Sequence, residues 1–92
     1  MSVPLFELGR LAATPGALAL LASAGQNPAE LLDRHTSGDW GEIPPEDARE
    51  NKLSVREGFR ILSSYPVGAG EKVWIITEAD RSSTCILLPS EY

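Results

Sequence analysis

The spacing of apolar residues changes once along the chain, close to Phe59. Before this point apolar residues recur at intervals of three and four, which is the pattern of one buried helix face. After it they alternate with polar residues or run together, which is typical of strands. The sequence therefore predicts helices first and a sheet afterwards, an α+β fold in which the helices pack on the sheet.

Two helices are predicted next to each other in the first part of the chain. Thr14 and Asn27 are favourable N-caps, and each is followed by a proline at the first helical position, where a missing N–H costs nothing. Gly25 ends the first helix, and Glu30 completes a capping box in the second. Because so few residues join them, we expect the two helices to form a tight αα-hairpin.

A third helix is predicted from about Pro45 to Glu57, with acidic residues in its first turn and Ala48, Lys52 and Val55 on its inward side. The N-terminal residues Val3 to Ala13 mix apolar and polar positions. They predict either a short edge strand or an extended arm.

The last third of the chain predicts a three-stranded antiparallel meander. Its strands are 60–67, 72–78 and 84–88, and short connections at 68–70 and 80–82 make neighbours antiparallel. With 92 residues the chain is expected to form one domain around one core. The predicted core includes Leu18, Leu21, Leu32, Val55, Phe59, Ile61, Trp74, Ile76, Ile86 and Leu88.

Composition narrows the classes of function. The net charge is −5, and the excess of acidic residues is concentrated in residues 35–50. Because the sequence has no basic stripe to hold a phosphate backbone, tight non-specific binding of nucleic acid is disfavoured. One cysteine and one histidine exclude an internal disulfide and a Cys/His zinc cluster, and no motif indicates a metal or a cofactor. With no apolar run long enough to span a membrane and no signal-peptide pattern, we expect a cytoplasmic protein.

The first candidate for chemistry is the segment that contains His35, Asp39 and Trp40, where two glycines flank the acid and the tryptophan. A sole histidine beside a carboxylate on a rigid turn could act as a general acid/base pair. The structural alternative is a histidine at a helix C-terminus, an Asx-turn and a core tryptophan.

The second candidate is the hairpin that contains Arg81 and Thr84. Arg81 could bind a phosphate, with Ser82, Ser83 or Thr84 donating hydrogen bonds to it. The alternative is a polar hairpin with an exposed ion pair between Asp80 and Arg81. Cys85, in an apolar strand, is expected to be a buried hydrophobe rather than a nucleophile. If a site exists, we expect it where the 35–40 turn meets the Arg81 hairpin.

Four segments together resemble a family of small bacterial proteins that have no assigned activity and are common on plasmids and integrated elements. These are LGRLAATPGALALL at 8–21, RHTSGDWGEI at 34–43, EGFRILSSY at 57–65 and GEKVWIITEADRSSTCILLPSEY at 70–92. The resemblance covers nearly the whole chain, and it implies a setting on a mobile element.

Helices followed by an antiparallel meander, with RILSSY at 60–65 and KVWIITEADRSSTCIL at 72–87, also resemble the C-terminal half of barnase-like and RelE-like endoribonuclease domains. This resemblance implies cleavage of RNA without a metal. It places Arg81 and Thr84 among the phosphate-binding and catalytic groups, with His35 serving from the preceding helix and Asp39 or Glu42 as the second acid/base.

Three hypotheses for function follow. The first is a mobile-element accessory protein that binds another protein through its acidic middle segment, because small acidic proteins without a strong catalytic signature are more often partners than enzymes. The second is a metal-independent ribonuclease that uses His35 and Arg81. The third is an acidic mimic of DNA that inhibits a defence enzyme. The edge strands of a small sheet also offer a surface through which two copies could form a homodimer.

Overall fold

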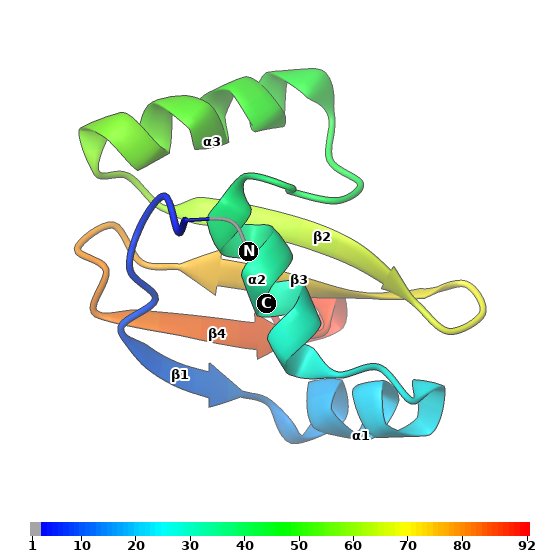
Figure 1. The fold of residues 1–92 in the computed structure, drawn as a ribbon. Helices are drawn as coiled ribbons and strands as arrows, with labels where there is room; N and C mark the ends of the chain where they lie inside the picture. The colour runs from blue at the N-terminus through cyan, green and yellow to red at the C-terminus, as the bar shows by residue number, and fades with distance from the viewer. Residues whose placement is uncertain (1–2) are drawn as a thin grey trace.

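The fold is α+β, as predicted, and Figure 1 shows its arrangement. The structure is a computed structural model that describes residues 3–92. The elements in chain order are β1 (Arg10–Ala13), α1 (Pro15–Ala24), α2 (Pro28–Ser37), α3 (Pro45–Glu57), β2 (Ile61–Val67), β3 (Glu71–Thr77), β4 (Ser83–Leu87) and a short 3₁₀ helix, η1 (Pro89–Glu91). None of the described helices is both long and apolar enough to cross a bilayer.

The sheet has four described strands in the order β1-β4-β3-β2, so the predicted three-stranded antiparallel sheet is wrong in part. β2, β3 and β4 form the expected antiparallel meander. β1 adds a parallel edge strand to β4, with Arg10 beside Ser83 and Ala13 beside Ile86. The prediction missed this pairing because no short connection links strands so distant in sequence, so local patterns carry no signal for it.

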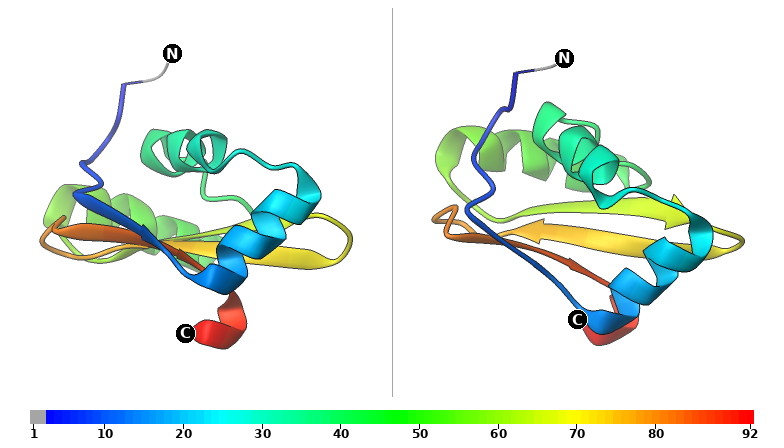
Figure 2. Two further views of the ribbon diagram at one scale, coloured as in Figure 1. Left: turned by 90° about the horizontal axis from the view of Figure 1, so that it is seen from below. Right: turned by 60° about the horizontal axis from the view of Figure 1, so that its bottom comes forward.

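The helices cover one face and one edge of the sheet. Thr14 and Asn27 cap α1 and α2 as predicted, each accepting a hydrogen bond from a backbone N–H. The two helices diverge, however, instead of forming an αα-hairpin (Figures 1 and 2). α1 packs against β2 and β4, α2 crosses the middle of one face, and α3 lies along the β2 edge. Each helix is therefore stabilised by the sheet rather than by a partner helix.

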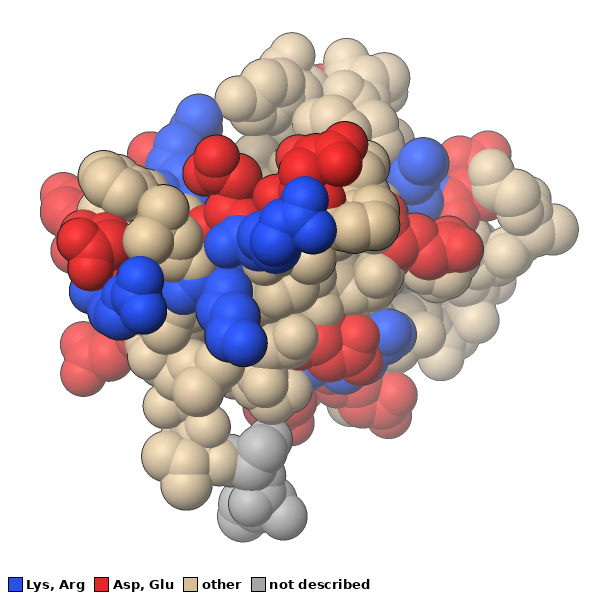
Figure 3. Space-filling model, turned by 90° about the horizontal axis from the view of Figure 1, so that it is seen from above, with Lys and Arg blue, Asp and Glu red and all other residues tan. Residues whose placement is uncertain are grey.

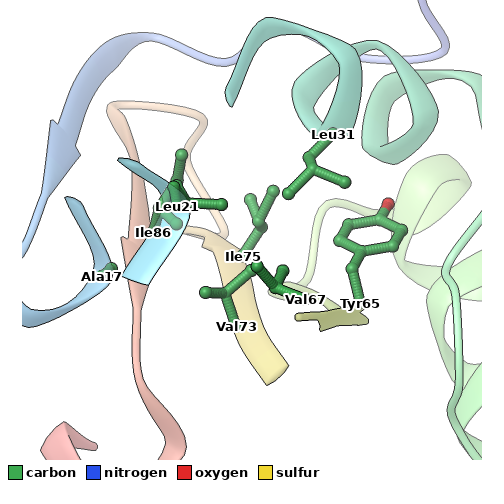
Figure 4. Close-up of a cluster of buried hydrophobic side chains, with 8 residues drawn as sticks. All are labelled: Ala17, Leu21, Leu31, Tyr65, Val67, Val73, Ile75 and Ile86. Atoms are coloured by element: carbon green, nitrogen blue, oxygen red, sulfur yellow. The ribbon is translucent and has the colours of Figure 1, made fainter. Parts of the chain in front are cut away.

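The core lies between the sheet and the α1–α2 side, and Figure 4 shows its centre. Of the predicted core residues, Leu21, Ile61, Ile76 and Ile86 are buried, and Leu32, Val55, Trp74 and Leu88 are half-buried. Leu18 and Phe59 are wrong, being 50% and 53% exposed. α1 buries the face that carries Ala17 and Leu21, which turns Leu18 outward, and Phe59 lies in the loop before β2.

Three different features prevent another strand from pairing with the outer edge of β2. The Asn51 side chain donates to the Leu62 carbonyl at 2.6 Å and accepts from the Leu62 N–H at 3.1 Å, as a neighbouring strand would. Ser64 pairs with the backbone of residues 40–42, and Pro66 has no N–H to offer. A further strand therefore cannot pair along β2 without displacing α3 or the 40–42 segment.

This edge also explains how α3 is held. Its buried residues are Asn51 and Ser54, whereas the predicted inward residue Lys52 is exposed. The helix is thus attached by hydrogen-bonding side chains rather than by an apolar stripe, which an apolar-periodicity argument does not detect.

Candidate functional site

His35 is fully buried between α2 and the sheet. Its Nδ1 lies 2.5 Å from the Ser63 hydroxyl on β2, and its Nε2 lies 2.9 Å from the Thr77 hydroxyl on β3. The Thr77 hydroxyl lies 2.8 Å from the Thr84 hydroxyl on β4, which donates to the Leu8 carbonyl at 2.7 Å. One continuous chain of hydrogen bonds thus ties the N-terminal arm, three strands and α2 together.

The Leu8 carbonyl at the end of this series of hydrogen bonds fixes which atom is the donor in each of them. The Leu8 carbonyl only accepts, so the Thr84 hydroxyl donates to it and accepts from Thr77. Having used its proton, Thr77 accepts from His35 Nε2–H, which leaves Nδ1 to accept from Ser63. His35 is therefore the neutral Nε2–H tautomer with both ring nitrogens engaged.

The surroundings of His35 oppose its protonation. Burial, and to a smaller extent the positive charge of Arg81, lowers the pKa of His35 from 6.5 to about 4. A general base has to reach the proton that it removes. In this geometry His35 instead serves as a structural group that links elements.

The Phe6 ring fills the space where the sequence placed a site. It meets the His35 ring edge-on at 5.2 Å, stacks on Trp40 at 6.3 Å and lies under the Arg81 guanidinium at 5.4 Å. The 35–40 turn and the Arg81 hairpin do come together, as expected. What lies between them is a side chain of the N-terminal arm, 9% exposed.

Arg81 binds backbone carbonyls. Its Nη1 donates to Phe59 at 2.7 Å and to Glu78 at 3.1 Å, and its Nη2 donates to Ser54 at the end of α3 at 2.8 Å. The described ion pairs do not include the expected one between Asp80 and Arg81. Arg81 thus fastens the β3–β4 hairpin to α3, with both Nη atoms donating to backbone carbonyls.

Asp39 belongs to a separate network. It forms an ion pair with Arg34, in which Arg34 Nε lies 2.7 Å from the carboxylate. The hydrogen bond from Arg34 is the main cause that holds the pKa of Asp39 below its usual value. Arg34 lies over the Tyr65 ring at 4.6 Å, and the Tyr65 hydroxyl donates to the Asp39 carbonyl at 2.6 Å. Asp39 is directed to the surface at the end of α2, and no described hydrogen bond joins its side chain to His35.

Two other predicted positions lie on β4. Thr84 is buried within the His35 chain of hydrogen bonds, so no hydroxyl proton is left for a phosphate. Cys85 is half-buried on the opposite face, and burial raises the pKa of its thiol. A raised pKa leaves less of the reactive thiolate.

The face of the sheet opposite α2, here called the open face, carries a feature that the site prediction missed. A groove of about 290 Å³ runs between Arg60, Leu62, Trp74, Ile76 and Tyr92, and its lining is almost entirely carbon. The Trp74 and Tyr92 rings meet at 5.6 Å, and Arg60 lies over Tyr92 at 5.9 Å. The signal in the sequence was the alternation along β3, which puts Trp74 and Ile76 on the same side.

Two further observations bear on these sites: one concerns metal binding and the other concerns similarity to known proteins. Among residues 3–92, no group of three or more His, Cys, Asp or Glu side chains is arranged to hold a metal ion. Comparisons with protein-family models, with curated proteins and with solved structures find no match to this chain.

Proposed function

We propose that this chain is a protein-binding module, an accessory protein of a mobile element in the cytoplasm, and that its partner binds the open face. The observation that carries the proposal is the groove between Arg60, Trp74 and Tyr92. Tryptophan, tyrosine and arginine are the residues that most often dominate the binding energy of protein interfaces. His35 and Arg81, the candidate catalytic residues, form hydrogen bonds within the fold, which favours a binding role over catalysis.

The charges around the groove indicate the partner's chemistry. Arg60 lies at one end, and Lys72 lies on the same side of β3 as Trp74, beside η1. Arg60 also pairs with Glu78 at 3.4 Å, so part of its charge is compensated. A segment with a large apolar side chain flanked by carboxylates would fill the groove and meet both cations.

A peptide-display selection tests this proposal. Wild-type protein should enrich peptides that combine an apolar or aromatic residue with Asp or Glu, and Arg60→Ala and Tyr92→Ala should weaken their binding about tenfold or more. Phe59→Ala is the matched control, because Phe59 is also an exposed aromatic residue but lies outside the groove. No enrichment, or equal binding by all four proteins, would refute the open face as the binding surface. Preference for single-stranded RNA over every peptide would do the same.

Ribonuclease activity is the second candidate, supported by the meeting of His35 and Arg81 at Phe6. It requires the arm to withdraw, so Phe6→Ala should cleave a structured RNA in EDTA faster than wild type does. Adding His35→Ala to that variant should abolish the cleavage. Absence of cleavage by both wild type and Phe6→Ala would remove this candidate.

The acidic segment offers less support for a mimic of DNA. On α3, Glu46, Asp47 and Glu50 are exposed together with Arg49 and Lys52. Figure 3 shows blue and red side chains interleaved over this side of the molecule. A mimic of DNA needs a continuous row of negative charge, because duplex DNA carries one charge for about every 1.7 Å of its axis.

A further inference from the structure

The two edges of the sheet are treated differently. β2 is closed by Asn51, by residues 40–42 and by Pro66. β1 borders only β4: Arg10 N–H donates to Ser82 and Thr14 N–H donates to Ile86. Because alternate residues of a strand direct their backbone groups to opposite sides, the N–H and C=O groups of Leu11 and Ala13 point away from the sheet. The described residues leave this edge open.

An apolar surface accompanies the open edge. Leu11 is 55% exposed and Leu18 is 50% exposed. They line a groove of about 230 Å³ whose floor includes Leu32 and Ile86. An exposed, apolar edge strand is a template for pairing with another strand, and natural proteins usually protect it with charge, proline or a covering segment. Here the surface fits an occupant that is both extended and apolar.

We infer that the occupant is a second copy of this chain, with the two β1 strands antiparallel about a two-fold axis that passes by Ala12. In this register Leu11 lies opposite the partner's Ala13, and each pair exchanges two backbone hydrogen bonds. The Leu11 side chain then lies against the partner's groove, and the reverse contact follows from the symmetry. Only the small Ala12 side chains face each other at the axis.

Charge complementarity favours a second copy over an unrelated strand. The same register puts Arg10 opposite the partner's Thr14. The hydroxyl of Thr14 donates to the Glu91 carboxylate at 2.6 Å, so a negative charge stands beside that position. This bond and the Leu88 N–H hold the pKa of Glu91 below its usual value, which keeps it charged. Within the described chain Arg10 has no ion pair. In the dimer each Arg10 gains an ion pair with the Glu91 carboxylate of the other copy.

Sedimentation equilibrium over a concentration series tests the pairing. We expect the wild type to shift from 9.9 kDa to twice that mass. Leu11→Asp should weaken dimerisation about tenfold or more, since it buries a charge at the interface. Leu53→Asp is the matched control, because Leu53 is an exposed leucine on α3 and should leave the dimer unchanged. A wild type that stays monomeric, or a Leu11→Asp variant that dimerises normally, would overturn the inference.

A charge exchange distinguishes this register from any other use of β1. Arg10→Glu and Glu91→Lys should each weaken the dimer, and the double variant should recover most of the loss. Circular dichroism melting of each protein verifies that the fold is intact. Two single variants with no effect, or a double variant without recovery, would reject the Arg10–Glu91 contact and with it the proposed axis. The peptide selection on the open face is independent of this outcome.

Discussion

Two adjacent serines on β2 have opposite environments. The Ser63 hydroxyl donates to His35, whereas the Ser64 hydroxyl is buried without a hydrogen-bond partner among the described residues. An unsatisfied buried hydroxyl costs free energy, and breaking a satisfied bond leaves its partner unsatisfied. The two positions therefore form an internal control for each other.

We predict that Ser63→Ala lowers the free energy of unfolding by about 1–3 kcal/mol, because it leaves His35 Nδ1 buried without a donor. Ser64→Ala should leave the stability unchanged or raise it by up to about 1 kcal/mol. Urea unfolding of both variants at neutral pH measures the difference. Equal losses from the two substitutions would contradict a stabilising role of the Ser63–His35 hydrogen bond.

The same histidine should make stability depend on pH. The pKa of His35 is about 4 in the folded chain, against an ordinary value of 6.5. Between these values the unfolded chain binds a proton that the folded chain does not, so the free energy of unfolding falls as the pH decreases through this window. The full loss is about 3 kcal/mol. Above pH 6.5 both states are neutral at this residue, and its contribution no longer changes.

Chemical unfolding of the wild type between pH 7 and pH 4 measures this slope. His35→Gln should remove most of it, whatever its effect on stability at neutral pH. Asp39 adds a separate loss at lower pH, since its pKa lies below the ordinary 3.8. A His35→Gln variant with the same slope as wild type would assign the effect to other groups.

At the scale of elements, the main feature is the protected edge of β2. Besides Pro66, its protection depends on the Asn51 side chain and on the turn at residues 40–42. The turn needs glycine at position 41, where φ is +74° and an added Cβ would lie 2.1 Å from the Ser64 carbonyl oxygen. Gly25 has a similar φ of +66° but open space around it. The two glycines therefore separate close approach from backbone conformation.

We predict that Gly41→Ala destabilises the protein by several kcal/mol, on the order of the largest single-residue effects, because the 40–42 segment must leave Ser64. Gly25→Ala should cost only about 1 kcal/mol, the price of a left-handed conformation for alanine. Thermal unfolding of the two variants measures the contrast. Similar losses would show that the close approach to Ser64 is dispensable.

The contribution of the Asn51 side chain is tested separately. Asn51→Ala should lower the free energy of unfolding by about 1–3 kcal/mol, since the partly buried N–H and C=O of Leu62 lose their partners. It should also raise aggregation, because the uncovered edge becomes available to other chains. Lys52→Ala, an exposed neighbour, is the control for helix propensity. Light scattering on partly unfolded samples measures the second effect.

At the scale of the whole molecule, Phe6 of the N-terminal arm joins the 35–40 turn to the β3–β4 hairpin. Replacing Phe6 with alanine should cost about 3–5 kcal/mol, as for other buried phenylalanines. It should also raise the pKa of His35 towards 6.5, because water gains access to the ring. Titration of the imidazole signal by NMR, at a temperature where the variant is folded, reports this. An unchanged pKa would mean that other groups keep His35 dry.

Much of this arrangement was accessible from the sequence, and the failures have common causes. Capping residues and proline positions predicted α1 and α2, and alternation predicted the β2–β4 meander, because these signals are local. The parallel pairing of β1 with β4 and the polar attachment of α3 were missed because they depend on contacts between distant residues. The meeting of the 35–40 turn with Arg81 was predicted, but the arm that fills the space between them was not. No local signal tells that Phe6 belongs there.

The β1–β4 pairing has a consequence for synthesis of the chain. Leu8 and Thr84, which are joined by a hydrogen bond, lie 76 residues apart. At the usual elongation rates a ribosome takes about 4–15 s to add that many residues. During this interval the nascent arm has no strand to pair with, and its leucines are exposed to the ribosome surface and to chaperones. β1 is therefore translated before the other three described strands and is among the last to be placed.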